Sequence, residues 1–387
     1  MKAIINAKVK TMTGKDYDDG VILIEKGKIV KVGSSKTVKV PKNAEVIDAK
    51  KKLVTPGLID AHSHMGMWEE SIGFEGSDGN EITDPVTPNM RAIDAVYPFD
   101  TQFESARNGG VTAVVTGPGS ANVIGGTFVA IKTVGKCVDD MVIKDPVAMK
   151  CAFGENPKRC YGTSSKMPMT RMATAALLRQ TIEQTIEYNA KKKAAKKDPA
   201  KMPPYNAKLE AMIPVIEKKI PLKAHAHRTD DILTSIRIAK EYGLKLTLDH
   251  CTEGHLIVDE VKKSGFNAII GPTYGFRTKY ELRNKTFDTP GILSKAGVKI
   301  AIMTDSPVHH QSELPLFAAM AVNSGMDREE ALKAITINAA EITGIDKRVG
   351  SIAPGKDADI VIWDTDPLSL EHRTYMVLID GEVVHKK

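Results

Sequence analysis

Short apolar runs alternate with longer segments of helical periodicity through the middle of the chain. This alternation is typical of β/α units around a parallel sheet, in which each buried strand is followed by a helix that covers it. Eight such runs occur in series, at 53–62, 111–116, 128–133, 147–153, 221–225, 245–250, 267–271 and 299–304. Eight parallel strands close a (β/α)₈ barrel. The pattern therefore predicts an α/β fold with a TIM barrel over residues 55–346.

The two ends of the chain have a different pattern, rich in β-branched residues and without helical periodicity. Residues 21–33 form two β-rich runs about a Lys-Gly turn, and 358–363 and 376–384 repeat this pattern, the last with an Asp-Gly turn. Each end alone has too few strands to be stable. We therefore expect one small β-sandwich domain built from residues 1–54 and 347–387.

Composition places the chain among ordinary globular proteins, with 42% hydrophobic and 26% charged residues in 387. The net charge is +6, and we expect the basic clusters at 191–193 and 196–197 to be solvated. Aromatic residues make up 5% of the chain and no nucleic-acid motif occurs, which argues against a nucleic-acid partner. No signal peptide or bilayer-length apolar run occurs, and the four cysteines lack CxxC spacing, so we expect a cytoplasmic protein with reduced thiols and no membrane partner.

Metal-ligating residue types stand at the ends of five of the eight predicted strands. The active site of a (β/α)₈ barrel lies at the C-terminal ends of its strands, so these side chains should converge at one mouth. Neutral imidazoles and carboxylates are the ligands that divalent metals such as zinc take from proteins. The residues concerned are His62, His64, Glu155, His225, His227, His250 and Asp305.

With those residues identified, the chain resembles the amidohydrolase superfamily of metal-dependent hydrolases over essentially its whole length. The segment Pro-Gly-Leu-Ile-Asp-Ala-His-Ser-His at 56–64 looks like the opening motif of that superfamily. Residues 350–361 are similar to its C-terminal segment, in which the chain returns from the barrel to the β-sandwich. Within the superfamily, the chain is most similar to the imidazolonepropionase-related group, which includes members with the segment Gly-Glu-Asn-Pro-Lys-Arg, here 154–159.

The resemblance implies one or two divalent ions, zinc first, with iron or manganese as alternatives. It implies a ligand set of His62, His64, His225 and His250, with Asp305 as both ligand and proton shuttle. Members of the superfamily complete this set on the fourth strand with a carboxylated lysine or a glutamate. Of the two residues available, we favour Glu155, which follows a glycine just beyond the strand, and expect Lys150 to face the surrounding helices.

The reaction implied is hydrolysis of a C–N bond, in a linear or cyclic amide, by a metal-activated hydroxide with Asp305 as general acid and base. His227 and His255 are candidates either for stabilising the oxyanion or for orienting a ligand. Deaminases of the superfamily carry a glutamate three residues after the strand-five histidine, where this chain has Arg228. Arg228 suits a substrate carboxylate or phosphate, or alternatively pairs with Asp230 or Asp231.

Specificity is expected from the long segments that follow the strands. The segment 65–97 is a candidate lid, and Tyr274 and Arg277 are candidate substrate contacts. A peptidase of the Xaa-Pro dipeptidase or carboxypeptidase kind is an alternative reading, deamination is a third, and a catalytically silent scaffold is the non-enzymatic one. The expected partner is a small-molecule substrate, and the substrate itself and homo-oligomerisation stay open.

Overall fold

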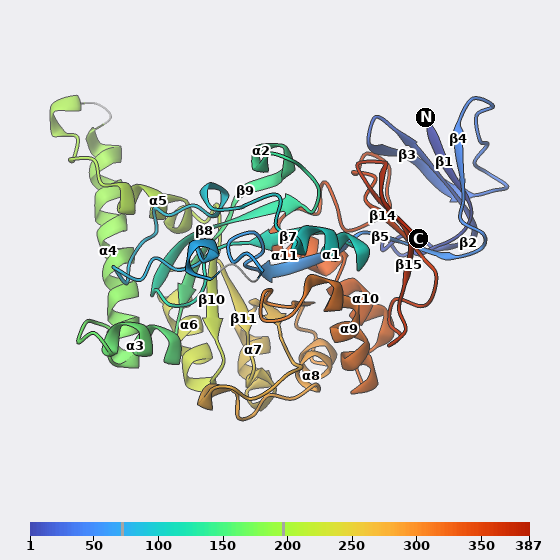
Figure 1. Ribbon diagram of the computed structural model, residues 1–387. Coiled ribbons are helices and arrows are strands. Elements are labelled where there is room, and N and C mark those ends of the chain that lie inside the picture. Colours follow the sequence, from blue (N-terminus) through green and yellow to red (C-terminus); the bar gives the residue numbers. More distant parts are fainter. Residues whose placement is uncertain (71–72, 196–197) are drawn as a thin grey trace.

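The computed structural model describes residues 1–70, 73–195 and 198–387 and contains two eight-stranded sheets. One sheet lies at the centre and the other at the right of Figure 1, where the blue N-terminal and red C-terminal segments lie together. The predicted basic pair at 196–197 lies outside the described residues, whereas Lys191, Lys192 and Lys193 form ion pairs with glutamates. In the described part of the chain, no helix is long and apolar enough to cross a membrane.

The terminal sheet is built from both ends of the chain, as the pattern predicted. Its strands are β1 (Lys2–Val9), β2 (Tyr17–Glu25), β3 (Lys28–Ser34), β4 (Glu45–Asp48), β5 (Leu53–Pro56), β14 (Ile360–Trp363), β15 (Thr374–Ile379) and β16 (Glu382–Lys386). Their order is β16-β15-β14-β5-β1-β2-β3, with β4 on β1. The two ends meet where β5 and β14 pair antiparallel. The sheet thus joins both ends, and its description as a sandwich stays a prediction.

The central sheet follows the predicted series of strands in chain order. Its members are β6 (Leu58–Ser63), β7 (Val111–Thr116), β8 (Ile124–Lys132), β9 (Val142–Ala152), β10 (Leu222–Ala226), β11 (Leu246–His250), β12 (Asn267–Ile270) and β13 (Ile300–Ile302). The first predicted strand is divided at Gly57 between the two sheets. A side chain at Gly57 would overlap Thr112, so the chain passes between the sheets at a residue without one.

One strand departs from the expected parallel arrangement. β8 pairs antiparallel with both β7 and β9, whereas the neighbours from β9 to β13 and the pair β6 and β7 are parallel. The physical reason is the short connection between β7 and β8, residues 117–123, because a parallel crossover needs a dozen or more residues. The prediction of eight parallel strands is therefore wrong at β8, and the sheet is a nearly closed barrel with one reversed strand.

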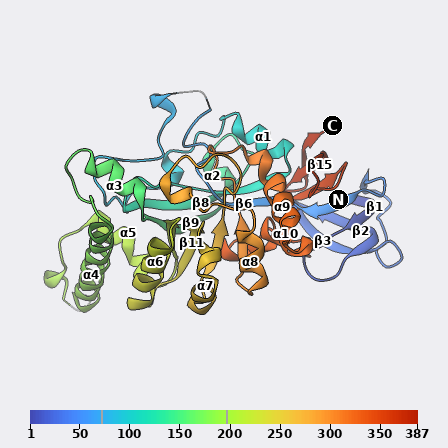
Figure 2. The same cartoon turned by 90° about the horizontal axis from the view of Figure 1, so that it is seen from below.

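Helices cover the outer face of this barrel, with α4, α6, α7 and α8 in a row along one side (Figure 2). In α6, Ile232, Ile236 and Ala239 recur at helical spacing and are buried against the strands. The helices are α1 (Gln102–Asn108), α2 (Val138–Met141), α3 (Glu155–Gly162), α4 (Arg171–Ala195), α5 (Ala207–Ile216), α6 (Thr229–Glu241), α7 (Val258–Ser264), α8 (Thr289–Lys295), α9 (Leu314–Asn323), α10 (Arg328–Ala334) and α11 (Ile337–Thr343). Short 3₁₀ turns are η1 (Phe74–Gly76), η2 (Ala92–Asp94), η3 (Pro199–Lys201), η4 (Gly254–Leu256), η5 (Tyr280–Leu282) and η6 (Gln311–Glu313).

The reversal of β8 has a consequence for how the two sheets join. Lys132, at the C-terminal end of β8, lies beside the terminal sheet instead of the barrel mouth. Its buried Nζ donates to both carboxylate oxygens of Asp359 at 2.7 Å and to Asp380 at 3.1 Å, and lies 3.0 Å from Asp357. A lysine with three carboxylate neighbours therefore connects the barrel to the strands from the C-terminus.

Candidate metal centre

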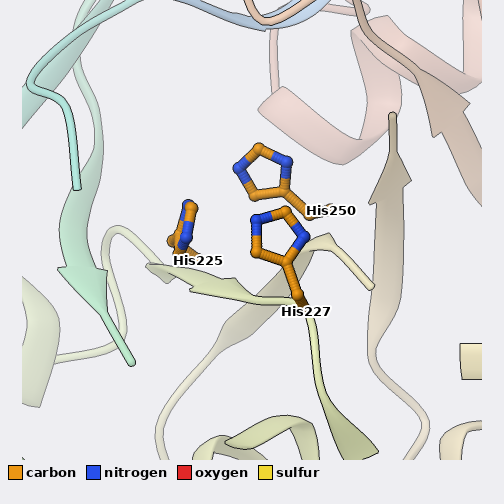
Figure 3. Close-up of side chains that lie close together, drawn as sticks. All are labelled: His225, His227 and His250. Carbon is orange, nitrogen blue, oxygen red and sulfur yellow. The ribbon is translucent and has the colours of Figure 1, made fainter. Parts of the chain in front are cut away.

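Two groups of three metal-ligating side chains come together at the carboxyl ends of the parallel strands. The first group is His62, His64 and Asp305, and the second is His225, His227 and His250. Within each group, the ligand atoms all lie within 4.8 Å of one another. The three rings of the second group face one another in Figure 3. The tertiary structure thus brings together six of the sequence-predicted site residues.

The histidines of the first group have fixed tautomers. His62 donates through Nδ1 to the buried carboxylate of Asp249, and His64 donates through Nδ1 to the carbonyl of Gly117 at 2.6 Å. Each Nε2 is therefore left with a lone pair. Asp305 Oδ1 lies 3.2 Å from Nε2 of His64 and 3.5 Å from Nε2 of His62. This is the arrangement in which carboxylates and carbonyls orient metal-ligating histidines.

The second group is oriented in the same way. His250 donates through Nδ1 to the carbonyl of Gly271 at 2.7 Å, and Nδ1 of His227 is hydrogen-bonded to Thr252 Oγ1 at 2.7 Å. The centroid of the His225 ring lies 4.3 Å from that of His250 and 4.7 Å from that of His227. The side chains are almost completely buried, so their orientation is set by packing as well as by hydrogen bonds.

The protonation states of these side chains at neutral pH favour metal binding. Burial lowers the pKa of His62, His225 and His250 well below the usual value, and lowers that of His227 to about 4. Burial opposes ionisation of Asp305, but the imidazoles of His250 and His64 outweigh it and lower the pKa of Asp305 to about 2. At neutral pH these four imidazoles are therefore neutral and the carboxylate of Asp305 is ionised, which are the forms that bind divalent metals.

Two residues of these groups have a strained backbone. His250 and Asp305 have φ values of 67° and 57°, in the left-handed region that residues other than glycine rarely adopt. Such conformations cost about 1–3 kcal/mol each and persist where the surrounding structure enforces them, often at functional sites. The two strand ends are thus held in an unfavourable backbone geometry that aims their side chains into the mouth.

The fourth-strand residue in contact with the histidines is Lys150. Lys150 is completely buried, and its Nζ lies 3.4 Å from Nε2 of His62 and over the ring of Phe128. The expectation that Lys150 faces the surrounding helices is therefore wrong, because alternation along β9 turns this position into the barrel. Burial lowers the pKa of Lys150 to about 8, against the opposing charges of Asp249 and Asp305.

Glu155, favoured from the sequence as the fourth-strand ligand, lies in neither histidine group. It is the first residue of α3, and its Oε2 accepts a hydrogen bond from the backbone N–H of Glu281 at 2.7 Å. In return, Glu281 Oε2 accepts from the N–H of Glu155 at 3.0 Å. The two glutamates therefore tie the start of α3 to the segment after β12. Gly154 precedes this contact, and a side chain there would overlap Glu281.

Glu281 is a site residue that the sequence reasoning missed. Its side chain is buried, its Oε1 has no hydrogen-bond partner, and that oxygen lies 3.6 Å from His227 Nε2 and 3.9 Å from His225 Nε2. Lys279 Nζ lies 3.8 Å from the same oxygen. No strand end indicates Glu281, because it stands eleven residues beyond β12, in the short turn η5. A glutamate in a predicted loop after strand seven was the only signal in the sequence.

Of the four remaining candidates from the sequence, one lines the cavity and three do not. Tyr274 lines the cavity above the histidines, as expected of a substrate contact. Arg277 donates to the carbonyl of Lys285 at 3.0 Å, and His255 is hydrogen-bonded to Thr289 Oγ1 at 2.9 Å. Arg228 forms two 3.0 Å hydrogen bonds with Asp230, the structural alternative to substrate binding. These last three side chains are outside the set that lines the cavity.

The histidine groups lie in an open cavity of about 930 Å³. Its walls include parts of the segment after β6, through Trp68, Glu69, Glu70 and Asn80, and the role of this segment as a lid stays a prediction. The start of α3 contributes Asn156 and Arg159 to another wall. The cavity has the volume of a site for a small molecule.

The donor set fits a divalent metal. Asp305 Oδ1 is buried in the described structure without a hydrogen-bond partner, and leaving a carboxylate oxygen in that state is costly unless a cation or donor meets it. That oxygen faces the Nε2 atoms of His62 and His64. Nitrogen and carboxylate donors in groups of three are typical of catalytic zinc sites.

Comparisons with known proteins identify the family to which the chain belongs. The model of the amidohydrolase family matches residues 53–384. The chain is 30% identical to amidohydrolase tasK of Hapsidospora irregularis over 94% of its own length, but spans only 39% of that protein. It is 25% identical to the imidazolonepropionase of Sphingopyxis alaskensis, over 95% of this chain and 93% of that one.

Among solved structures, the amidohydrolase of Thermotoga maritima superimposes over the full length of both chains, with a TM-score of 0.96 and 41% identity. A Xaa-Pro dipeptidase structure with bound methionine has a TM-score of 0.59 at 16% identity, which supports the fold alone. The fold, the converging strand ends and these matches lead to one conclusion: the chain belongs to the amidohydrolase family and, within the superfamily, to its imidazolonepropionase-related group.

Proposed function

We propose that this protein is a metal-dependent amidohydrolase that cleaves a C–N bond, in an amide or cyclic amide, of a small polar molecule. The observation that carries the proposal is the convergence of two three-donor groups at one cavity, with neutral imidazoles and an ionised carboxylate. The enzyme would comprise a barrel over 55–346 and a terminal β-domain over 1–54 and 347–387, and would act in the cytoplasm.

The metal would be held by His62, His64 and Asp305 in the first group and by His225 and His250 in the second. Zinc suits these ligands best, with iron or manganese as alternatives. We further propose Lys150 in place of Glu155 as the fourth-strand ligand, after its amine adds to the carbon of carbon dioxide and loses a proton. A second buried lysine, Lys223, is unsuited to this reaction because its Nζ already donates to Asp249 at 2.8 Å and to Ala61 O at 2.9 Å.

A bound divalent metal would supply an activated water at neutral pH and a Lewis acid for the substrate carbonyl. Asp305 would take the water's proton and return it to the departing nitrogen, since this carboxylate is ionised at neutral pH. His227, whose Nδ1 is fixed by Thr252, would direct Nε2 towards the substrate oxygen.

Deamination of a ring is a second candidate, favoured by one observation. The sequence argument against it was the absence of a glutamate after the strand-five histidine. In the folded chain, Glu281 brings a carboxylate from elsewhere to within 3.9 Å of His225 Nε2. A deaminase would release ammonia from a cyclic amidine, whereas an amidohydrolase would release a carboxylate and an amine or open a cyclic amide.

The test combines elemental analysis with a substrate screen. We expect one or two zinc, iron or manganese ions per chain in the wild type and loss of metal in the His62→Ala/His64→Ala variant. The metal-loaded enzyme should then hydrolyse at least one class among N-acyl amino acids, dipeptides and cyclic amides. Ammonia release from cyclic amidines alone would support deamination instead. Absence of metal after expression in metal-supplemented medium would contradict both reactions and support the scaffold.

A further inference from the structure

A role for the Gly-Glu-Asn-Pro-Lys-Arg segment follows from how α3 sits against the second histidine group. The N-terminal turn of α3 is fixed by the reciprocal hydrogen bonds between Glu155 and Glu281. On the same turn, Asn156 donates to Ser120 Oγ at 2.7 Å, and its Nδ2 lies 3.4 Å from Nε2 of His225. The first turn of α3 is therefore anchored directly beside a proposed metal ligand.

Arg159 lies one turn further along the same helix. Residues three apart on a helix share a face, with Cβ atoms roughly 5–6 Å apart. Arg159 therefore projects on the side of α3 that carries Asn156, and it lines the cavity. Its side chain is exposed, and in the described structure its guanidinium has neither an ion pair nor a hydrogen bond. The segment thus places an uncommitted cation on the cavity wall, one turn of helix from Asn156.

The other cations of this wall have partners. Lys285 Nζ donates to the backbone carbonyls of Tyr274, Gly275 and Phe276, and Lys279 lies 3.8 Å from the buried carboxylate of Glu281. Arg228, the cation suggested by the sequence for substrate binding, is engaged by Asp230. These contacts leave Arg159 as the cation best placed to meet a ligand anion from this side of the cavity.

We propose that Arg159 binds a carboxylate of the substrate, so that the amides cleaved here are those with a free carboxylate close to the scissile bond, such as N-acyl amino acids. This inference rests on the proposed function and specifies its substrate class. A guanidinium offers a carboxylate two parallel N–H donors. A phosphate is less well served, because a single exposed guanidinium would neutralise only part of its charge. Trp68 and Leu282 also line the cavity, so an apolar amino-acid side chain would find apolar contacts.

The experiment compares matched pairs of compounds that differ only in the carboxylate. The probes are N-acetyl-L-leucine, N-acetyl-L-methionine and N-acetyl-L-phenylalanine, each with its carboxamide, and the assay is release of acetate by the metal-loaded enzyme. For the carboxylates, Arg159→Met should lower kcat/KM by about 10- to 100-fold, mainly through KM, because it removes a charge-assisted hydrogen bond. The carboxamides should be unaffected. Arg159→Lys should give an intermediate value, and Arg237→Met, on the exposed face of α6, should match the wild type.

Equal effects of Arg159→Met on both members of each pair, or no effect on either, would overturn the inference and leave the proposed function standing. A second measurement separates the two claims. Calorimetric binding of the same pairs is measured in the Asp305→Asn background, with and without Arg159→Met. If the carboxylates bind in an Arg159-dependent way but the wild type hydrolyses none of the probes, nor any dipeptide or cyclic amide of the earlier screen, the carboxylate site stands and the hydrolytic function fails. If the carboxylates bind no more tightly than the carboxamides, the carboxylate site is rejected.

Discussion

Lys223 and Asp249 form a buried ion pair on neighbouring strands directly beneath the histidines, with Nζ 2.8 Å from Oδ2. The same carboxylate accepts from Nδ1 of His62, and Nζ of Lys223 also donates to the carbonyl of Ala61 at 2.9 Å. Lys223 thereby connects β10, β11 and β6, the three strands that carry His225, His250 and His62. One ion pair holds together the ends of strands that contribute to both histidine groups.

Lys223→Met should destabilise the metal-free protein by about 3–5 kcal/mol, because it leaves the carboxylate of Asp249 buried without its cation. Urea unfolding of the metal-free protein measures the change. The double variant Lys223→Met/Asp249→Asn should recover much of the loss, since an amide needs no cation and its oxygen still accepts from His62. A double variant no more stable than Lys223→Met would show that the charge of Asp249 is not the cause.

Lys150→Met should lower the metal content, because it removes the proposed fourth-strand ligand. Glu155→Gln is the matched control, and it should keep its metal if Glu155 only accepts from the backbone of Glu281. Elemental analysis gives the content, and NMR of the wild type loaded with ¹³C-bicarbonate should show a carbamate signal that is missing in Lys150→Met. Metal loss in Glu155→Gln with normal content in Lys150→Met would restore the assignment made from the sequence.

Asp305→Asn should reduce kcat by at least about 10²-fold, the range usual for loss of a general acid or base. The neutral amide cannot take up a proton from water at neutral pH. Part of the metal should remain, since the histidines are unchanged. Steady-state kinetics, corrected for measured metal content, separate the loss of proton transfer from the loss of metal. Activity per bound metal equal to that of the wild type would remove Asp305 from the proton-transfer role.

Lys132→Met should weaken the junction of the two sheets without changing the metal centre. It removes the cation shared by Asp359, Asp380 and Asp357, and loss of one partner from a buried ion pair costs about 3–5 kcal/mol. Lys191→Met, which breaks an exposed pair on α4, should cost less than about 1 kcal/mol. Denaturant unfolding gives both values. Equal stability of the two variants would show that the junction does not depend on this cation.

Much of the fold could be predicted because its signals are local. A buried strand needs a run of apolar residues and a covering helix needs apolar residues at 3.6-residue spacing, and both patterns can be recognised without knowing what they pack against. The run at 111–116 therefore coincides with β7, and the pairing of both chain ends was expected from their patterns. The direction of β8 could not be predicted in this way, because strand direction depends on the path of the connecting segment, and the pattern of apolar residues does not indicate that path.

The residues of the candidate site also fall into two sets, those that the sequence predicts and those that only the tertiary structure shows. The sequence by itself determined the strand-end histidines and Asp305, since a barrel brings the ends of distant strands to one mouth. Only the tertiary structure decided that Lys150 contacts His62, that Arg228 pairs with Asp230, that Glu281 lies beside His227, and that Arg159 lines the cavity. The physical reason is that a side chain's role depends on which groups lie beside it in the folded chain. When those groups are far apart in sequence, tertiary packing decides which of them come into contact.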